Sequence, residues 1–536
     1  MAEEQLAFAR KASGLVRGLS MWDAFGVGFM NQGLTPSIVV MTSLGVGVYT
    51  GGNMIIAVVL SVILAGIGMP IVWGVLGGSM PRSGGEYIYN SRIIHPIIGI
   101  AESFGNAFVW IMWIYVLAPW IADPGLTMLA SFTGAQGLAD WATQPYATFI
   151  LATIANIIAF CFVVFGIKIF ARAQKIIMAI GIGGCIVLTV VLSISAGGFA
   201  DSWNEMAAKH NSLDYNAFLK AVEAQAGAAM PTTWNWFDSL GVMVAASWAF
   251  AYAYCMAFIA GEVKRPDKTI IMANLFAVLV PGIFCLWTAI ALYQLDFNFL
   301  SAAFYADNLE NYAWSIEGFN LPFSTNYVGL AFIMLPNAVL GVIYALSYIA
   351  FALWWVTLSY LAFPRIIFAW GMDRMGPKWF TDVDARWASP VKNHVLCFIL
   401  GEIGIALYVF WTNSPLQGLA VTGLEVVTVF GVTAIAALIF PYRKRARGIW
   451  NASPYRTWKL LGIPVVTLGA FVDLIYLAIL FVFFFIMPDL RDFTRTGVIF
   501  FCSIWLAGIL WYFYWKWRSR TVGVDVSMTY GELPPE

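Results

Sequence analysis

The chain has 536 residues, of which 61% are hydrophobic and only 11% are charged, compared with about 25% charged residues in an ordinary soluble domain. A soluble fold of this length cannot bury so much apolar surface, so we expect a lipid bilayer to surround most of the chain. The net charge of zero excludes the strongly basic surface that is typical of nucleic-acid-binding proteins.

Apolar windows of about 20 residues, long enough to cross a bilayer, recur twelve times along the chain. The eighth window is too long for one span, and Pro336 removes a backbone hydrogen-bond donor inside it. We therefore expect its first part to be an outer half-helix lying against the membrane helix proper. The predicted spans are 20–48, 52–78, 96–120, 145–167, 172–197, 236–260, 270–294, 328–371, 391–411, 417–441, 461–486 and 496–516.

The charges between the spans predict the orientation of the chain. An even number of spans places both termini on one side, and the alternating loops then put 25 of the 29 Lys and Arg residues on that side. The four on the other side are Lys209, Lys220, Arg491 and Arg495. Because short loops rich in Lys and Arg stay in the cytoplasm, we expect a multi-pass protein of the cell membrane with both termini cytoplasmic.

The first span carries polar and helix-breaking residues in its middle. Asn31, Gln32, Gly33 and Pro36 lie there; glycine loosens a helix and proline removes a donor. We expect a local unwinding near Asn31–Gly33, because irregular backbone survives at membrane depth only where protein or water satisfies its polar groups. The freed N–H groups would face an anionic group such as a carboxylate. The alternative is a small-residue face that packs against neighbouring helices.

The sixth span gives a weaker signal for a break, since no Gly or Pro lies between Gly241 and Gly261. Tyr252 and Tyr254 in its middle fit either the wall of a pocket or a core in which their hydroxyls find partners. The third and eighth spans also carry aromatic residues at helical spacing, which are more often packing residues than a binding site.

Asp23 and Glu102 lie near the cytoplasmic ends of their spans, where they either latch gates or are hydrated helix ends. Three carboxylates lie deeper inside predicted spans, namely Glu402, Glu425 and Asp473. An ionisable group in hydrocarbon costs a few kcal/mol unless it is paired or hydrated, so each is a candidate for binding a substrate or a proton. Glu425 lies at a depth that suits such a site. The alternative is that they pair with neighbouring polar side chains or with one another.

The cysteine and histidine patterns favour no disulfide, metal site or catalytic set. None of the cysteines form a CxxC motif, and each lies within or beside an apolar run, so we expect small buried side chains. The three histidines lie in or beside loops, without an HExxH motif. We therefore expect no enzyme and no cofactor. The cysteines are Cys161, Cys185, Cys255, Cys285, Cys397 and Cys502.

Four turn-bearing segments at the ends of spans carry a resemblance: PRSGGEYIY (81–89), FGIKIFARAQKI (165–176), GEVKRPDKTI (261–270) and PRIIFAWGMDRMGPKWF (364–380). In this order they resemble the amino acid–polyamine–organocation (APC) superfamily of permeases, over essentially the whole chain. The resemblance implies an all-α polytopic membrane protein with 12 transmembrane helices and a LeuT-like fold. It implies two inverted repeats of five spans each, with two peripheral helices outside them.

The resemblance also implies how the chain is divided into segments. It consists of a cytoplasmic tail (1–18), a first transmembrane repeat (19–197), an extracellular loop (198–235), a second repeat (236–441), spans eleven and twelve (461–516) and a cytoplasmic tail (517–536).

The resemblance also implies that substrate is held between broken first and sixth helices. The substrate-carboxylate loop falls on Asn31–Gly33, where relatives usually have Gly-Ser/Thr-Gly. Relatives often have Gly where this chain has Tyr252 and an acid where it has Tyr254, and many proton-coupled relatives have Lys where it has Gly181. The expected substrate-binding residues are Met30, Asn31, Gln32, Gly33, Trp113, Trp248, Phe250, Ala251, Tyr252, Tyr254, Trp355, Ser359 and Glu425, with Thr357 and Ser359 as candidates for ion coupling.

We therefore expect a secondary active transporter for amino acids or related small amines, working by alternating access as a symporter or exchanger. The candidate coupling ions are H+ and Na+. A cationic amine over the aromatic rings would gain cation–π energy, and Glu425 would pair with it. The alternative is a channel or carrier of the same fold for a different small organic solute.

Overall fold

The computed structural model describes residues 15, 17–227, 230–231, 233–311, 315–411, 420–486, 495–523, 525–531 and 533. Ten helices in this part of the chain are long and apolar enough to cross a membrane. The α-helices are α1 (Met21–Gln32), α2 (Leu34–Val40), α3 (Met54–Ser79), α4 (Glu86–Ile93), α5 (Pro96–Leu117), α6 (Thr127–Thr133), α7 (Gln136–Ala142), α8 (Pro145–Val164), α9 (Ile167–Ile194), α10 (Phe199–Lys209), α11 (Tyr215–Ala226), α12 (Trp236–Ala246), α13 (Pro266–Leu292), α14 (Phe297–Asn311), α15 (Tyr327–Met334), α16 (Ala338–Met372), α17 (Val391–Phe410), α18 (Ala420–Ile439), α19 (Arg447–Ala452), α20 (Val465–Ile486) and α21 (Arg495–Thr521).

Short 3₁₀ and π helices and one hairpin complete the described elements. The hairpin joins β1 (Lys459–Leu460) to β2 (Ile463–Pro464) in antiparallel register. The 3₁₀ and π segments are η1 (Met41–Val46), η2 (Pro119–Ile121), η3 (Ala122–Leu126), η5 (Ser247–Ala249), η6 (Ala251–Glu262), η7 (Lys378–Thr381), η9 (Lys444–Ala446) and η10 (Val526–Gly531).

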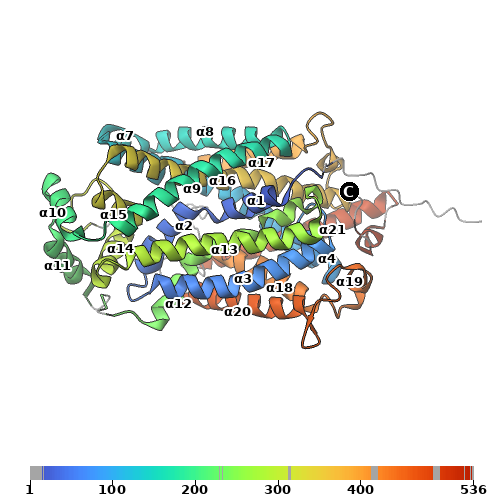
Figure 1. Cartoon of the computed structure of the whole chain (residues 1–536). Coiled ribbons are helices and arrows are strands. Elements are labelled where there is room, and N and C mark those ends of the chain that lie inside the picture. Colours follow the sequence, from blue (N-terminus) through green and yellow to red (C-terminus); the bar gives the residue numbers. More distant parts are fainter. Residues whose placement is uncertain are drawn as a thin grey trace, which may run out of the picture.

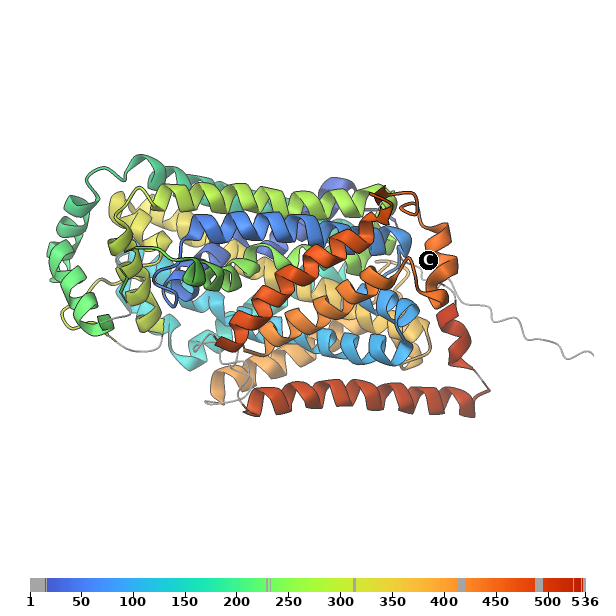
Figure 2. The ribbon, with the colours of Figure 1, turned by 90° about the horizontal axis from the view of Figure 1, so that it is seen from below.

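The long helices run side by side as a single bundle (Figure 1). Within it α3 packs along α13, and α16 packs against α9 and α5. Helix α21 lies along the outside of the bundle and contacts α5 (Figure 2). Its apolar side chains point away from the protein, so that Leu506 is 54% exposed and Leu510 is 60% exposed. An apolar outer surface of this kind is what a bilayer covers.

The segments between the long helices form a helical cap at one end of the bundle, where α10 and α11 lie in Figure 1. We call this the cap end. Trp203 on α10 packs edge-on against Phe299 of α14 and at a tilt against Phe218 of α11, with ring centroids 5.0 Å and 4.8 Å away. Its indole N–H donates to the carbonyl of Leu213 at 3.1 Å. A small aromatic core therefore holds the cap together, while the C-terminus lies at the opposite end, the C-terminal end.

Ten of the twelve predicted spans are supported directly by long helices. The first is divided into α1 and α2. The tenth corresponds to α18 (Ala420–Ile439), in which Val429–Ile439 is the part that lies within the fully described residues and is apolar. The division of the eighth window is confirmed, since α15 ends at Met334 and α16 begins at Ala338. Asn337 caps α16 by accepting hydrogen bonds from two backbone N–H groups, which explains why the new helix begins immediately after the break.

The cysteine prediction is correct for four residues and wrong for two. All six are free thiols. Cys502 is exposed and Cys161 is half-buried, because they lie on outward faces of α21 and α8 where lipid replaces protein as the apolar environment. The buried ones are Cys185, Cys255, Cys285 and Cys397.

Two buried ion pairs join the helices at the C-terminal end. Arg365 Nε lies 2.6 Å from Glu262 Oε1 and links α16 to η6. Arg92 Nη1 lies 2.6 Å from Asp373 Oδ2, and the Tyr87 hydroxyl donates to the same carboxylate oxygen at 2.8 Å. A buried charge that loses its partner is strongly destabilising, so these pairs fix how the helices meet.

Replacing Arg365 with methionine is expected to lower the free energy of unfolding by about 3–5 kcal/mol, because Glu262 loses its cationic partner in a buried site. Lys392→Met is the matched control, since Lys392 Nζ also lies 2.6 Å from a carboxylate, that of Asp382, but both groups are exposed. This control should lose less than about 1 kcal/mol. Thermal unfolding in detergent, followed with a thiol-reactive dye that detects the buried cysteines, measures both losses. Equal losses in the two variants would contradict the prediction.

Candidate functional site

The first span is broken at Gly33, as the sequence predicted. Helix α1 ends at Gln32, Gly33 has a left-handed backbone (φ 52°), and α2 begins at Leu34. A β-carbon at this position would collide with the indole ring of Trp355, so glycine is required both for its backbone and for its size. The Ser37 hydroxyl donates to the Gln32 carbonyl at 2.6 Å and satisfies a group that the break releases.

The sixth span is also broken, although it lacks the Gly or Pro that would have signalled this. Helix α12 ends at Ala246, η5 follows, and Phe250 has a non-helical backbone (φ −134°, ψ −31°) before η6 begins. This conformation has a negative φ, which any residue can adopt. The departure from the family pattern at Tyr252 therefore does not prevent a break in the sixth span.

One side chain joins the two breaks. The Asn31 amide Nδ2 donates to the backbone carbonyl of Tyr252 at 2.7 Å, and the indole Nε1 of Trp355 donates to the Asn31 carbonyl at 2.8 Å. All three residues are more than nine-tenths buried. Asn31 is therefore costly to remove, because its loss leaves a buried carbonyl without a donor.

The two halves of the first span are tied to different turns of the neighbouring helices. Thr35 Oγ1 donates to Ser347 Oγ of α16 at 2.7 Å, and Ser347 Oγ donates to the Gly181 carbonyl of α9 at 2.7 Å. On the inner half, Gln174 Nε2 donates to the Asp23 carbonyl at 3.0 Å. The break at Gly33 thus separates two segments that have their own attachments.

A small central cavity lies where the two breaks meet. Its volume is about 20 Å³, enough for roughly one water molecule. The ring of Trp113 stands edge-on to Trp248 at 5.4 Å and to Tyr252 at 5.7 Å, and Trp248 lies 5.8 Å from Trp355. The cavity is lined by Asn31, Trp110, Trp113, Leu117, Trp248, Tyr252 and Trp355.

Five of these seven lining residues belong to the set predicted from the sequence. Trp110 and Leu117 were missed, although they lie three residues before and four residues after Trp113 on α5. Helical spacing places all three on one face of that helix, so the signal was present once Trp113 had been chosen.

Several predicted site residues lie outside the lining of the central cavity. Tyr254 packs against Trp73 and Phe430, with ring centroids 4.7 Å and 4.6 Å away. Thr357 Oγ1 donates to the Leu353 carbonyl of its own helix at 2.9 Å, and its predicted role in ion coupling stays a prediction. The others are fully buried beside the breaks or on α16, and they are Met30, Gln32, Gly33, Phe250, Ala251 and Ser359.

Two of the three predicted intramembrane acids, Glu402 and Asp473, are absent from the described lining of the central cavity. Glu402 on α17 accepts hydrogen bonds from two side chains of α8, Asn156 at 2.9 Å and Thr153. Asp473 on α20 is fully buried, against Gly68 of α3. The side chain of Glu425 lies outside the described residues, so its predicted role stays a prediction.

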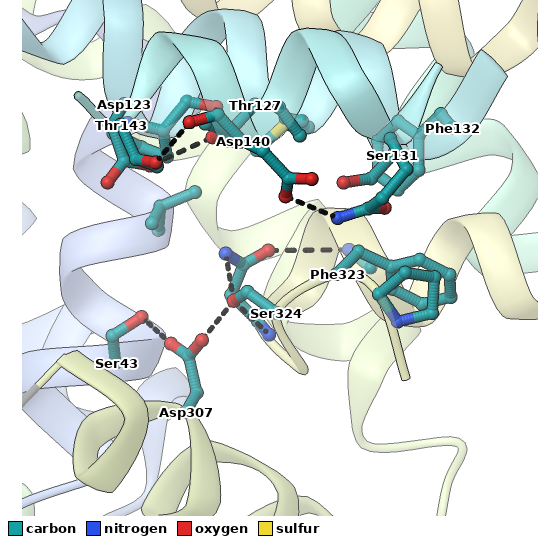
Figure 3. A pocket seen from close by; sticks show the side chains of 18 residues that line it. Ser43, Asp123, Thr127, Ser131, Phe132, Asp140, Thr143, Asp307, Phe323 and Ser324 are labelled. Carbon is teal, nitrogen blue, oxygen red and sulfur yellow. Dashed lines mark hydrogen bonds between the residues drawn. The ribbon is translucent and has the colours of Figure 1, made fainter. Parts of the chain in front are cut away.

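A larger cavity of about 400 Å³ lies at the cap end (Figure 3). Its described lining contains the carboxylates Asp123, Asp140 and Asp307 and no Lys, Arg or His. Asp307 accepts hydrogen bonds from the hydroxyls of Ser43 and Ser324. Burial raises the pKa of Asp307 to about 6, although these hydrogen bonds lower it. The described lining of this cavity therefore carries acidic groups without basic ones, and the cavity lies between η1 and the helices α6 and α7.

Comparison with known proteins identifies the family and the fold. The sequence model of the family described as amino acid permease matches residues 19–509, whereas no curated protein matches the chain. Among solved structures, the crystal structure of MhsT in complex with L-phenylalanine is similar, with a TM-score of 0.52 and 16% sequence identity. The similarity covers 86% of this chain and 98% of that chain. At this identity the likeness shows the fold alone.

The family match runs through both broken spans and through every segment on which the resemblance in the sequence was based. The chain therefore belongs to the amino acid permease family of the APC superfamily, has the LeuT fold, and is a membrane transporter.

Proposed function

We propose that this transporter is a secondary carrier that moves an amino acid or a related small amine by alternating access, as a symporter or exchanger. The observation that supports this most is the central cavity, which lies at the meeting point of two broken helices. Broken helices at membrane depth supply backbone groups for a solute. The cavity is too small for any amino acid in this state, so its aromatic walls must move before substrate enters.

The substrate carboxylate would bind at the start of the helical run that begins at Leu34, where backbone N–H groups lack partners within the helix. Asn31 and Trp355 hold the adjoining chain in place through the hydrogen bonds described above. The ammonium group, or an apolar side chain, would lie over the rings of Trp113, Trp248 and Tyr252. An ammonium ion over such faces gains about 0.5–2 kcal/mol, and Glu425 would add a charge partner.

The C-terminal end of the bundle would face the cytoplasm. The loops at that end carry most of the 29 Lys and Arg residues, and such loops remain on the cytoplasmic side of a cell membrane. Both termini would then be cytoplasmic, and the cap with its anionic cavity would face outward. The coupling ion would be H+ or Na+.

Counterflow in proteoliposomes tests the proposed function. Vesicles are preloaded with single amino acids or polyamines, including phenylalanine because MhsT was crystallised with it, and uptake of the labelled compound is followed. Saturable uptake that one preloaded class accelerates supports the proposal. Flux that neither saturates nor responds to preloading would favour a channel instead, and folded protein without any exchange would refute the choice of substrate class.

Gly33→Ala is expected to reduce counterflow at least about tenfold, because the added methyl group collides with Trp355 and strains the left-handed backbone. Gly198→Ala is the matched control. Gly198 also has a positive φ, 85°, but no atom lies within 4 Å of an added β-carbon. The control should keep counterflow within about twofold of the wild type. Similar losses in both variants would show that backbone strain alone, and not the approach of Trp355, limits transport.

Tyr252→Ala and Glu425→Gln are each expected to raise the half-saturation concentration for a cationic amine about tenfold, which corresponds to roughly 1.4 kcal/mol of lost binding energy. Tyr442→Ala is the control, since this tyrosine is 63% exposed and lies away from the cavity. Initial rates of uptake at graded substrate concentrations measure the change. Unchanged affinity in both site variants would contradict the proposed recognition of an amine.

A further inference from the structure

Helices α4 and α5 present matching pairs of polar residues to one another at the C-terminal end. Glu86 and Asn90 are four residues apart on α4, and Glu102 and Asn106 are four residues apart on α5. This spacing puts both members of each pair on one helix face. All four side chains are fully buried. We call these four residues the Glu–Asn cluster.

In the Glu–Asn cluster each helix donates one hydrogen bond to the other. The Asn106 amide donates to Glu86 Oε1 at 2.7 Å, and the Asn90 amide donates to Glu102 Oε2 at 2.7 Å. The Asn90 amide also donates to Thr433 Oγ1 of α18 at 3.1 Å. The arrangement therefore joins α4, α5 and α18 through neutral donors, in contrast to the Arg pairs at the same end of the bundle.

Glu86 lacks the partners that a buried carboxylate anion requires. Its second oxygen, Oε2, has no hydrogen-bond partner, and neither do the amide oxygens of Asn90 and Asn106. A buried carboxylate that is ionised without a cation costs several kcal/mol. A protonated carboxyl is neutral and has an O–H that can donate to one of these acceptors. The local chemistry thus fits a bound proton better than a fixed negative charge.

The neighbouring charges do not supply the missing cation. Arg92 and Arg365 are paired with Asp373 and Glu262, and no ion pair to Glu86 exists among the described residues. Burial raises the pKa of Glu86 to about 7, although the hydrogen bond from Asn106 lowers it. The ionisable groups on α4, on α5 and on the elements packed against them are Tyr87, Tyr89 and Arg92 on α4, Glu102 and Tyr115 on α5, Tyr344, Tyr348, Tyr360 and Arg365 on α16, Asp373 after it, Lys392, His394, Cys397, Glu402 and Tyr408 on α17, Glu425 on α18, Lys444 and Arg445 in η9, Arg495, Cys502, Tyr512, Tyr514, Lys516, Arg518 and Arg520 on α21, and Tyr530 in η10.

We propose that the carboxylates Glu86 and Glu102 form a proton-binding site that is coupled to transport. This inference rests on the proposed function. In the structure both carboxyl groups are fully buried, so a bound proton would be held there away from water. When the C-terminal end opens and α18 moves away from Asn90, water reaches the carboxyl group. The O–H bond then breaks, its electron pair stays on the carboxylate, and the proton passes to water.

The first test separates exchange from accumulation in proteoliposomes. Glu86→Gln keeps the size and the hydrogen bond from Asn106 but cannot ionise. We expect its counterflow at equal pH to stay within about twofold of the wild type, because exchange needs no net proton movement. Accumulation driven by a proton gradient should fall from above equilibrium to an inside-to-outside ratio of about one. The matched control is Glu402→Gln, which changes another glutamate that accepts a hydrogen bond from an Asn amide; this variant should keep both activities.

The outcomes distinguish this inference from the proposed function. Failure of the wild type to exchange any amino acid or amine refutes the proposed function and this inference with it. Wild-type exchange with undiminished proton-driven accumulation in Glu86→Gln refutes only the inference. Accumulation in the wild type that follows a sodium gradient and ignores a proton gradient refutes it too.

Thermal stability gives a second readout that does not depend on activity. A carboxyl whose pKa is higher in the folded than in the unfolded protein binds more protons when folded, so stability falls as pH rises from about 4.5 to about 7. The melting temperature should therefore fall less in Glu86→Gln than in the wild type when the pH is raised from about 5 to about 8. The same pH dependence in both proteins would overturn the proposal, even where the variant no longer transports.

Discussion

A backbone polar group that leaves the helical ladder inside a bilayer needs a partner from the protein itself, and the centre of this molecule is organised around that requirement. The breaks in the first and sixth spans release carbonyl groups of Gln32, Asn31 and Tyr252. Ser37, Trp355 and Asn31 supply the donors. Two of these donors also wall the central cavity. Asn31 and Trp355 thus satisfy the released backbone carbonyls and also form part of the cavity wall.

The features that the sequence predicted are those whose cause is local. The length of an apolar window predicts a span, and Gly33 and Pro36 predict a break, because backbone freedom and a missing donor belong to single residues. The break at Phe250 has a tertiary cause. Its released carbonyl is satisfied by Asn31, more than 200 residues away in the sequence, and no local signal announces such a partner.

The predicted site shows the same division. Trp113, Trp248 and Tyr252 could be placed through the resemblance to a family, whereas Tyr254 could not be separated from them, although its ring lies between Trp73 and Phe430. Two residues apart on a regular helix already means different faces, and on an irregular segment such as η6 the faces follow no simple period. The Glu–Asn cluster was not predicted, because each helix donates a hydrogen bond to the other and this exchange depends on how α4 packs on α5.

The hydroxyl chain from Thr35 through Ser347 to Gly181 has a mechanical consequence. It makes the outer half of the first span part of the frame formed by α9 and α16, while the inner half is fastened near the start of α9 and along η6. Both halves are thus anchored to α9 and α16 at different turns, because the Asn31 carbonyl of the inner half also accepts a hydrogen bond from Trp355 of α16. A change in the tilt of one half relative to the other would have to be absorbed at Gly33, where the backbone leaves the helix, and the hydrogen bonds to α9 and α16 would limit how far either half could tilt.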